Sequence, residues 1–387
     1  MAETSPLKKV VVLGSTGSIG ESSLTVARDI PERMEVIGLA ANSSVDSLAR
    51  QIGEFGVKQG CLYDPTGLDR LSTLVADDVT LHTGEEGLIE LATLPEADIV
   101  LIAIVGVAGL KPALAAIEAG KDIAVASKEI LVMAGETVMT AAREKGVQVL
   151  PVDSEHNAIF QCLEGRDSAD VSRLILTASG GPFRELPADQ LASVTKAQAL
   201  KHPTWEMGQK ITIDSATLFN KGLEMIEARW LFDIEMQRVD VIVHPQSIVH
   251  SMVEFIDSSI LAQLSTADMC FPIQYAVTWP ERVPNTLPPI DFAELARLDF
   301  EAPRWNDFPA LSLAREAGEK GGTLPAVMNA ANEVAVSAFL QESLPFPGIW
   351  ETVAAVMSDH STATQPSLEE IIDADLQARA KALELIS

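Results

Sequence analysis

The sequence is poor in cysteine and in positive charge. Its three cysteines among 387 residues are widely spaced and form no Cys-x-x-Cys pair, so neither a disulfide framework nor a thiolate zinc site is indicated. Lys and Arg total 28 against 55 Asp and Glu, for a net charge of −27. Binding to nucleic acid or to an anionic membrane surface depends on Lys and Arg. We therefore expect neither as a partner.

Long hydrophobic runs are also lacking. The most apolar stretch, residues 99–110, is much shorter than the about 20 residues of a membrane-spanning helix. The N-terminal residues lead into an apolar run too short for a signal peptide. With few cysteines as well, the sequence predicts a cytoplasmic protein. Its 47% hydrophobic and 21% charged residues are typical of a folded globular chain, and at roughly 150 residues per domain the length predicts two or three domains.

Short β-branched runs alternate with helical patterns over the first 150 residues. The runs are KVVVLG, MEVIGLA, DIVLIAIVG, DIAVAS and VQVLPV. Such alternation is typical of βαβ units. We therefore predict that residues 1–152 form a Rossmann-like, doubly wound parallel sheet in an α/β domain.

The pattern changes after residue 152. The runs RLILTAS, DVIVHP, HSMVEF and SILAQL predict strands that are too close together for crossover helices, so residues 153–279 should form a central α/β domain with a mixed sheet. Residues 280–289 contain four prolines, which indicates a linker over residues 280–306. Helical periodicity at 324–340, 348–358 and 367–386 predicts a C-terminal helical bundle over residues 307–387.

The motif GSTGSIG, residues 14–20, follows the first predicted strand and begins the first helix. Gly14 permits a tight turn, Gly17 allows a pyrophosphate to approach the backbone, and Gly20 lets helix and strand pack closely. A tight turn that binds nothing is the alternative. At the end of the second strand, no acid occurs among Asn42, Ser43 and Ser44. This favours NADP over NAD, although no Lys or Arg occurs there either.

Asp153 and Glu155 are the first candidate metal ligands. If the strand continues through them, their side chains share one face, and two carboxylates at the carboxyl end of a strand suit Mg²⁺ or Mn²⁺. The alternative is that Asp153 caps the next helix and Glu155 lies in its first turn.

Polar residues near another predicted helix start could bind an anion. Ser215, Asn220 and Lys221 precede or begin this helix, and Glu224 lies one turn beyond Lys221. The alternative is a solvated ion pair between Lys221 and Glu224.

Two segments rich in Gly and Pro, residues 177–187 and 201–210, predict a functional loop. The second segment contains Trp205, and we interpret residues 180–208 as a lid. For His202, His244 and His250, which lack the spacing of zinc ligands, a structural hydrogen bond is the default expectation.

Together these motifs resemble the 1-deoxy-D-xylulose 5-phosphate reductoisomerases of the non-mevalonate isoprenoid pathway. The resemblance covers nearly the whole chain, in the family's order, and the long central block from His202 is its most specific part. The motifs are GSTGSIG, AIVGVAGL, SKE, LPVDSEHNAIFQ, SGGPFRE, HPTWEMGQKITIDSATLFNKGLEMIEARWLF, HPQSIVHSM, LAQLSTADM and NAANE.

The resemblance implies roles for individual residues. The metal, Mg²⁺ or Mn²⁺, would be bound by Asp153, Glu155 and Glu224. The substrate phosphate would be bound by Ser179, His202, Ser215, Asn220 and Lys221, under Trp205 of the lid. Lys128 and Ser154 would act with the metal on the substrate oxygens. NADPH would lie along Thr16, Gly17, Ser18, Ile19, Asn42, Ser43, Ser44, Glu129 and Gly208.

The implied reaction rearranges the carbon skeleton of 1-deoxy-D-xylulose 5-phosphate and then reduces the aldehyde with NADPH to 2-C-methyl-D-erythritol 4-phosphate. The implied assembly is a homodimer through the central domain. Two alternatives remain: another metal-assisted NAD(P)-dependent hydroxy-acid dehydrogenase, and a non-catalytic dinucleotide sensor. Some relatives carry Lys where this chain has Ser43.

Overall fold

The computed structural model describes residues 6–387, which pack into two units. Unit 1 contains the residues up to 130, together with 136–157 and 268–288. Unit 2 contains residues 131–135, 158–267 and 289–387. The sequence analysis divided the chain into three domains and a linker, with boundaries that differ from those of the two units. That division remains a prediction.

Unit 1 is built on a seven-stranded sheet in the order β4-β3-β2-β1-β5-β6-β7, and all neighbours are parallel. Its strands are β1 Lys8–Leu13, β2 Met34–Ala41, β3 Gln59–Leu62, β4 Thr80–Thr83, β5 Ile99–Ile102, β6 Asp122–Val125 and β7 Val149–Pro151. This confirms the predicted doubly wound sheet. The sequence analysis did not predict β3 and β4, because each has only four residues and neither is a continuous β-branched run.

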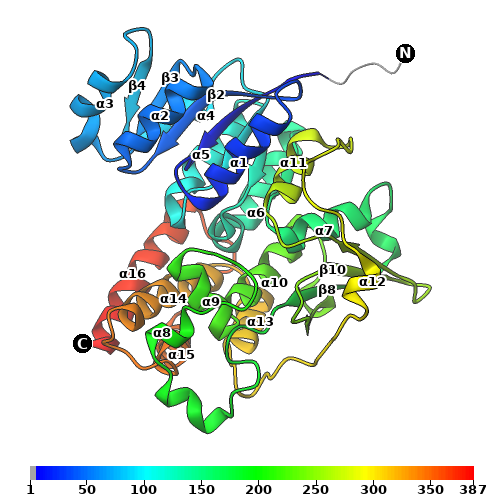
Figure 1. Ribbon diagram of the computed structural model, residues 1–387. Coiled ribbons are helices and arrows are strands. Elements are labelled where there is room, and N and C mark those ends of the chain that lie inside the picture. Colours follow the sequence, from blue (N-terminus) through cyan, green and yellow to red (C-terminus); the bar gives the residue numbers. More distant parts are fainter. Residues whose placement is uncertain (1–5) are drawn as a thin grey trace. The chain divides into compact units, whose positions relative to one another are not determined.

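The helices of unit 1 follow the strands in βαβ order. They are α1 Ser18–Asp29, α2 Val45–Phe55, α3 Leu68–Leu74, α4 Gly84–Ala92, α5 Leu110–Glu118, most of α6 Lys128–Lys145, and the later α11 Cys270–Thr278. In Figure 1, α11 lies beside α1, although some 240 residues separate them. Residues 10–13 of strand β1 and the whole of β5 are buried. Strand order reverses between these two, which is where doubly wound folds bind ligands.

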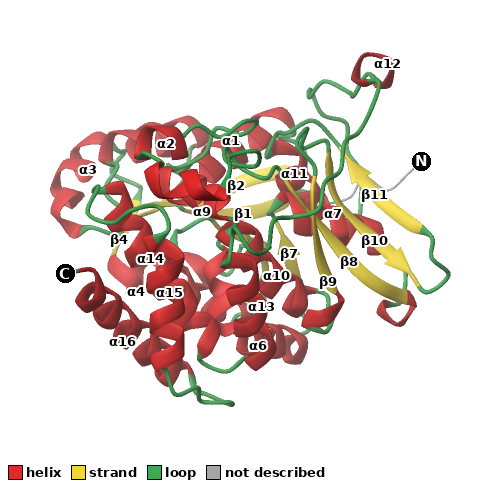
Figure 2. Ribbon diagram, turned by 90° about the horizontal axis from the view of Figure 1, so that it is seen from below, coloured by secondary structure: helices red, strands yellow, loops and turns green. Residues whose placement is uncertain are grey.

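Unit 2 contains a four-stranded sheet in the order β11-β10-β8-β9. Its strands are β8 Val171–Ala178, β9 Val239–Val243, β10 Val249–Phe255 and β11 Ile260–Leu264. Strands β8 and β9 pair in parallel, whereas β10 is antiparallel to both β8 and β11. The predicted mixed sheet is therefore confirmed, and Figure 2 shows its four strands side by side.

The helices of unit 2, apart from the short α12, share one core with this sheet. They are α7 Ser154–Leu163, which begins in unit 1, α8 Lys196–Ala199, α9 Gln209–Thr217, α10 Phe219–Leu231, α12 Phe292–Leu295, α13 Ala310–Lys320, α14 Leu324–Leu340, α15 Gly348–Asp359 and α16 Leu368–Ile386. The last four form the predicted helical bundle, and α14 contacts both α15 and α16 (Figure 1). Phe346 packs edge-on against Phe183, Phe339 and Trp350, with centroid distances of 5.1 to 5.6 Å.

The segment interpreted as a lid, residues 180–208, is partly helical. It contains the 3-10 helix η4 Ala188–Ser193 and the short helix α8, which has a capping box formed by Thr195 and Gln198. Among the helices of residues 6–387, none combines the length and apolarity needed to cross a membrane.

Candidate active site

The glycine-rich turn connects β1 to α1, as predicted. Gly14 has a φ of +95°, and a Cβ there would lie 2.5 Å from the carbonyl oxygen of Ala103. A Cβ on Gly20 would lie 2.3 Å from the oxygen of Gly14. Both positions therefore require glycine. Ser18 and Ile19 begin α1, where first-turn amides lack intrahelical acceptors and attract anions.

A buried glutamine that the sequence analysis missed supports this turn. Gln51 of α2 accepts a hydrogen bond of 2.7 Å from Ser15 Oγ, and its Nε2 donates to the carbonyl oxygen of Ser15 and to Glu21 Oε1, at 3.1 and 2.9 Å. Its position between buried Leu48 and Ile52 was the available signal, because a polar residue in an apolar stripe needs a specific partner.

The turn after β2 exposes Asn42, Ser43 and Ser44. The structure brings an arginine close to this turn. Arg70 lies on α3, far along the sequence from the turn, so the sequence analysis did not identify it. Its Nη2 lies 2.6 and 2.8 Å from the two carboxylate oxygens of Asp46, in the first turn of α2. The nearest acid to this turn in the sequence is therefore neutralised by an arginine.

Lys128 and Asp153 form an ion pair within unit 1. Their side chains are only 7% and 16% exposed, and Nδ1 of His156 lies 3.3 Å from Asp153 Oδ2. Burial acts to raise the pKa of Asp153, but the charge of Lys128 and the contacts of His156 outweigh it and hold this pKa far below its usual value. This lowered pKa favours the carboxylate form of Asp153. Glu129, next to Lys128 in the first turn of α6, is also buried.

The predicted strand geometry of Asp153 and Glu155 is wrong, and the alternative describes their positions. Strand β7 ends at Pro151, Asp153 immediately precedes α7, and Glu155 lies in the first turn of that helix. The carbonyl oxygen of Asp153 accepts from the amide of Asn157 at 2.8 Å, and Ser154 Oγ donates to Glu155 Oε2 at 2.6 Å. Helix α7 begins at Ser154, so the strand cannot continue to Glu155 as expected.

Three candidate phosphate ligands meet in unit 2. His202 Nε2 lies 3.0 Å from Ser179 Oγ and 3.0 Å from Ser215 Oγ. Nδ1 of His202 accepts from the amides of Thr204 and Trp205, at 3.3 and 2.9 Å. Since Nδ1 acts as an acceptor, a neutral His202 carries its proton on Nε2, between the two hydroxyl groups. The three side chains form a compact group of donors.

A left-handed residue joins this group to the next. Leu218, buried and with a φ of +66°, separates α9 from α10. Ser215 therefore lies in the last turn of α9 and precedes the start of α10, as expected, but the helix that contains it was not predicted. Asn220 and Lys221 do begin a helix, as expected. Nothing in the sequence marked the break, because left-handed Leu is uncommon.

Asn220, Lys221 and Glu224 interact along α10. Asn220 Nδ2 donates to Glu224 Oε1 at 2.6 Å, and Lys221 pairs with Glu224 Oε2. Lys221 and Glu224 are 3% and 0% exposed, so the expected alternative of a solvated pair is wrong. Asn220 Oδ1 is buried and has no hydrogen-bond partner among the described residues.

The remaining candidate residues of unit 2 are Trp205, Gly208, His244 and His250. Trp205 is half-buried, with its ring 6.2 Å from that of His250, and Gly208 occupies the N-cap position of α9. His244 Nδ1 contacts the carbonyl oxygen of Asp299 at 2.8 Å, and His250 Nε2 contacts that of Ser265 at 3.2 Å. Both histidines thus make the structural hydrogen bonds expected of them.

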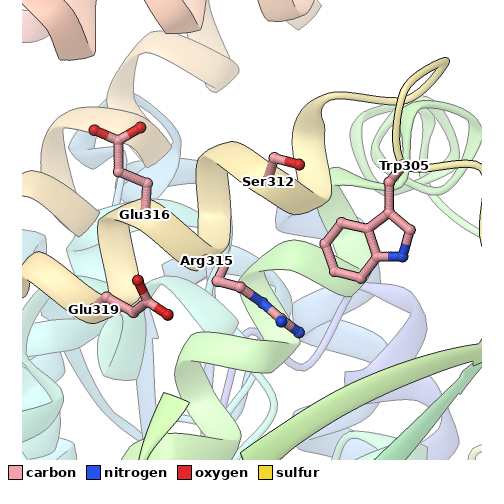
Figure 3. Close-up of a pocket in the computed structure, with 5 residues that line it drawn as sticks. All are labelled: Trp305, Ser312, Arg315, Glu316 and Glu319. Atoms are coloured by element: carbon pink, nitrogen blue, oxygen red, sulfur yellow. The ribbon is translucent and has the colours of Figure 1, made fainter. Parts of the chain in front are cut away.

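A separate surface pocket of about 360 Å³ contains none of these residues. It lies along α13, and the guanidinium of Arg315 stacks 4.8 Å from the ring of Trp305 (Figure 3). Its lining residues are Trp305, Ser312, Arg315, Glu316 and Glu319.

Family models match three parts of the chain. A model described as 1-deoxy-D-xylulose 5-phosphate reductoisomerase matches residues 10–135. A model of the C-terminal domain of the same enzyme matches residues 149–232, and a DXP reductoisomerase C-terminal domain model matches residues 264–381.

Curated relatives and solved structures agree with these models. The 1-deoxy-D-xylulose 5-phosphate reductoisomerases of Pelotomaculum thermopropionicum and Chlorobaculum tepidum are each 51% identical over 98% of this chain and over 99% and 100% of their own lengths. The Zymomonas mobilis enzyme in complex with NADPH is 45% identical over 98% of this chain and 99% of its own, with a TM-score of 0.92. A DOX-P reductoisomerase in complex with NADPH, fosmidomycin and magnesium is 42% identical over 98% of both chains, with a TM-score of 0.94. The chain therefore belongs to the 1-deoxy-D-xylulose 5-phosphate reductoisomerase family.

Proposed function

We propose that this chain converts 1-deoxy-D-xylulose 5-phosphate to 2-C-methyl-D-erythritol 4-phosphate, with NADPH and a divalent metal, in the non-mevalonate isoprenoid pathway. The observation that carries the proposal is that a chain similar over 98% of its length to a complex with NADPH, fosmidomycin and magnesium also retains the donor groups such ligands need. These groups are the glycine turn, three carboxylates and a hydroxyl–imidazole–ammonium set.

The glycine turn fits a dinucleotide. Because Gly14 and Gly20 leave no space for side chains, the backbone of residues 14–20 is tightly folded and can approach a pyrophosphate. We assign Thr16, Gly17, Ser18 and Ile19 to that contact, and Asn42, Ser43 and Ser44 to the adenine end. Glu129 and Gly208 complete the cofactor residues. When bound, NADPH supplies the hydride.

The acidic residues fit a hard divalent cation. Asp153 and Glu155 belong to unit 1 and Glu224 to unit 2, and we propose that all three bind one Mg²⁺ or Mn²⁺. The lowered pKa of Asp153 favours the ionised form, which is the form that binds a metal. Asn220, which contacts Glu224, has a buried Oδ1 without a hydrogen-bond partner among the described residues, which supports a bound ligand at this part of α10. When bound, the metal supplies Lewis-acid stabilisation of charge on substrate oxygen.

The substrate phosphate fits the donors of unit 2. Ser179, Ser215 and the Nε2 proton of His202 offer neutral donors, and Lys221 offers a charge. Asn220 completes the set. Lys221 pairs with Glu224 in this structure, and a bound phosphate would give its ammonium a second anionic partner. Trp205 and the rest of residues 180–208 would cover the substrate and exclude water.

Lys128 and Ser154 are assigned to the substrate's own oxygens. The Lys128 ammonium is buried against Asp153, so it is held in one position and can donate to an oxygen that gains charge. Ser154 Oγ donates a hydrogen bond to Glu155, which orients the hydroxyl group, and its oxygen can accept a hydrogen bond from a substrate hydroxyl.

We also propose a homodimer in the cytoplasm. The outer strand β11 pairs only with β10 among the described strands, and its first residue, Ile260, is 50% exposed, as is typical of an edge that another chain covers. Sedimentation at micromolar concentration tests the dimer. The location is supported by the odd number of widely spaced cysteines.

One assay tests the function. NADPH oxidation is followed with 1-deoxy-D-xylulose 5-phosphate, with and without a chelator, and again after Mg²⁺ is restored. We expect turnover that chelation abolishes and Mg²⁺ recovers. Turnover of a 2-hydroxy acid instead would favour the dehydrogenase alternative, and NADPH binding without any turnover would favour the sensor.

A further inference from the structure

A buried polar link connects α9 to α14. Asn332 Nδ2 donates a hydrogen bond of 2.8 Å to Asp214 Oδ1, and Lys210 Nζ lies 2.7 Å from Asp214 Oδ2. Asp214 is 1% exposed and Asn332 is wholly buried. The two elements lie more than a hundred residues apart in the sequence, and both belong to unit 2. Asn332 comes from the NAANE motif, to which no role in the proposed reaction has been given.

The link lies next to the candidate phosphate group. Ser215 follows Asp214 directly, and its Oγ lies 3.0 Å from His202 Nε2. A Cβ on Gly181 would lie 2.8 Å from the carbonyl oxygen of Ser215, so the Ser-Gly-Gly backbone packs directly on α9. A rotation of α9 would therefore change the distances from Ser215 to both His202 and Ser179.

The same rotation would affect α10. Only Leu218 separates the two helices, and it is buried in a left-handed conformation. Since this junction has one residue and little freedom, the first turn of α10, which carries Lys221, follows the orientation of α9. A change at the link to Asp214 would therefore affect both parts of the candidate phosphate site.

Stability alone does not explain this link. A buried carboxylate is costly to desolvate, and apolar pairs of similar volume often stabilise a core equally well. Moreover, Oδ1 of Asn332 and of its neighbour Asn329 are buried without a hydrogen-bond partner among the described residues. What a carboxylate–amide bond adds over apolar packing is direction, because it fixes the rotation of one helix against another.

The partner helix is itself held firmly. Asn329 Nδ2 donates to Glu333 Oε1 at 3.0 Å, and Glu333 pairs with Arg379 of α16 at 2.8 Å. Arg379 also pairs with Asp375 at 2.7 Å. Helix α14 is therefore a fixed reference, against which the nine-residue helix α9 is oriented.

We propose that Asp214 and Asn332 are positioning residues that set the rotation of α9 and so align Ser215, His202 and Lys221 for the substrate phosphate. The proposal rests on the proposed function, because it assumes that this group binds a phosphate. It assigns neither residue a contact with the substrate.

The test is an exchange of the two side chains. Asn332→Asp places two carboxylates together, and Asp214→Asn replaces the charged acceptor of this bond, which also pairs with Lys210, by a neutral amide. The double variant restores one carboxylate and one amide with nearly unchanged volume. The readout is the ratio of kcat/KM for 1-deoxy-D-xylulose 5-phosphate to that for the dephosphorylated sugar. We expect each single variant to lower this ratio about tenfold or more and the double variant to return it to within about threefold of the wild type.

The matched control is Asp240→Asn, which breaks the ion pair of another unit 2 carboxylate, with Arg173 at 2.7 Å, outside the network that holds α14. It should lower the melting temperature and leave the ratio unchanged. Equal losses for both substrates in the Asp214→Asn variant, a loss of the ratio in the control, or no recovery in the double variant would each overturn the proposal. If Asp214→Asn does not fold, Asn332→Ala, which keeps the Lys210 pair, replaces it.

Calorimetric titration with inorganic phosphate separates this proposal from the proposed function. Wild-type turnover of the sugar phosphate tests the function by itself. Weaker phosphate binding in the single variants, with recovery in the double variant, supports the positioning role even without turnover. Equal phosphate affinity in all variants contradicts it.

Discussion

Asn220 donates a hydrogen bond of 2.6 Å from Nδ2 to Oε1 of Glu224, one turn further along α10. Lys221 pairs with the second carboxylate oxygen. Two candidate phosphate ligands are thus in direct contact with a candidate metal ligand, in a part of the helix that is almost wholly buried. A substitution here can affect metal and phosphate together, so each experiment needs a readout specific to one of them.

Glu224→Gln removes one anionic metal ligand and nearly keeps the side-chain shape. We expect kcat to fall by about three orders of magnitude, because metal stabilisation of a charged transition state is worth several kcal/mol. NADPH affinity should be unchanged, since the glycine turn belongs to unit 1. Steady-state rates across a Mg²⁺ titration, with NADPH fluorescence as the binding readout, check this.

Two controls make that result specific. Glu319→Gln removes an exposed acid from the same unit and should leave kcat unchanged. Circular dichroism checks that the variant is folded, because the change leaves the buried Lys221 without its full counter-charge, which is destabilising. Wild-type turnover in Glu224→Gln would contradict the role of Glu224 as a metal ligand.

Lys221→Ala tests the phosphate contact. Loss of the charge should cost about 2 to 4 kcal/mol of transition-state binding for the phosphorylated substrate. The dephosphorylated sugar should lose much less, because it has no dianion to pair. The exposed Lys320→Ala serves as the control. Equal losses of kcat/KM for both sugars in the Lys221 variant would show that Lys221 is not a phosphate ligand.

The sequence predicted elements that have strong periodicity and clear ends. Helix α14 begins and ends at the predicted residues, because its apolar pattern is long. The parallel sheet and the mixed sheet also followed from the alternation of runs and from the lack of crossover helices. The sequence failed where structure depends on one residue in an uncommon conformation, as at Leu218, or on partners far apart in the chain.

Side chains that support the site were the least predictable. Gln51, Arg70 and Asn332 each contact a site segment from another helix, and none belongs to a motif whose chemistry is visible in the sequence. Tertiary packing determines such contacts, so neither spacing nor propensity reveals them. The candidate ligands, in contrast, were visible in the sequence, because their carboxylates, hydroxyl groups and one lysine occur close together within short segments.

Two cysteines should be unreactive in the folded protein. Burial raises the pKa of the Cys61 thiol to about 12, and burial together with nearby Asp268 raises that of Cys270 to about 12. At pH 8 roughly one thiol in ten thousand is then ionised, and the thiolate is the reactive form. We expect iodoacetamide labelling to be slow in buffer and fast in urea, as measured by mass spectrometry. Cys270 is the sharper case because it is only partly buried, and fast native labelling there would contradict the raised pKa.

Ser43→Asp tests cofactor preference at the exposed turn after β2. Arg70 neutralises Asp46 beside this turn, so the wild type presents hydroxyl groups and no unpaired carboxylate to a 2′-phosphate, and it should prefer NADPH. A new carboxylate at position 43 should lower the ratio of kcat/KM for NADPH over NADH about tenfold, which is the size of like-charge repulsion near a protein surface. Ser358→Asp, an exposed serine of unit 2, should leave the ratio unchanged. A wild-type ratio at or below one would refute the preference, and an unchanged ratio in Ser43→Asp would show that this serine does not face the 2′-phosphate.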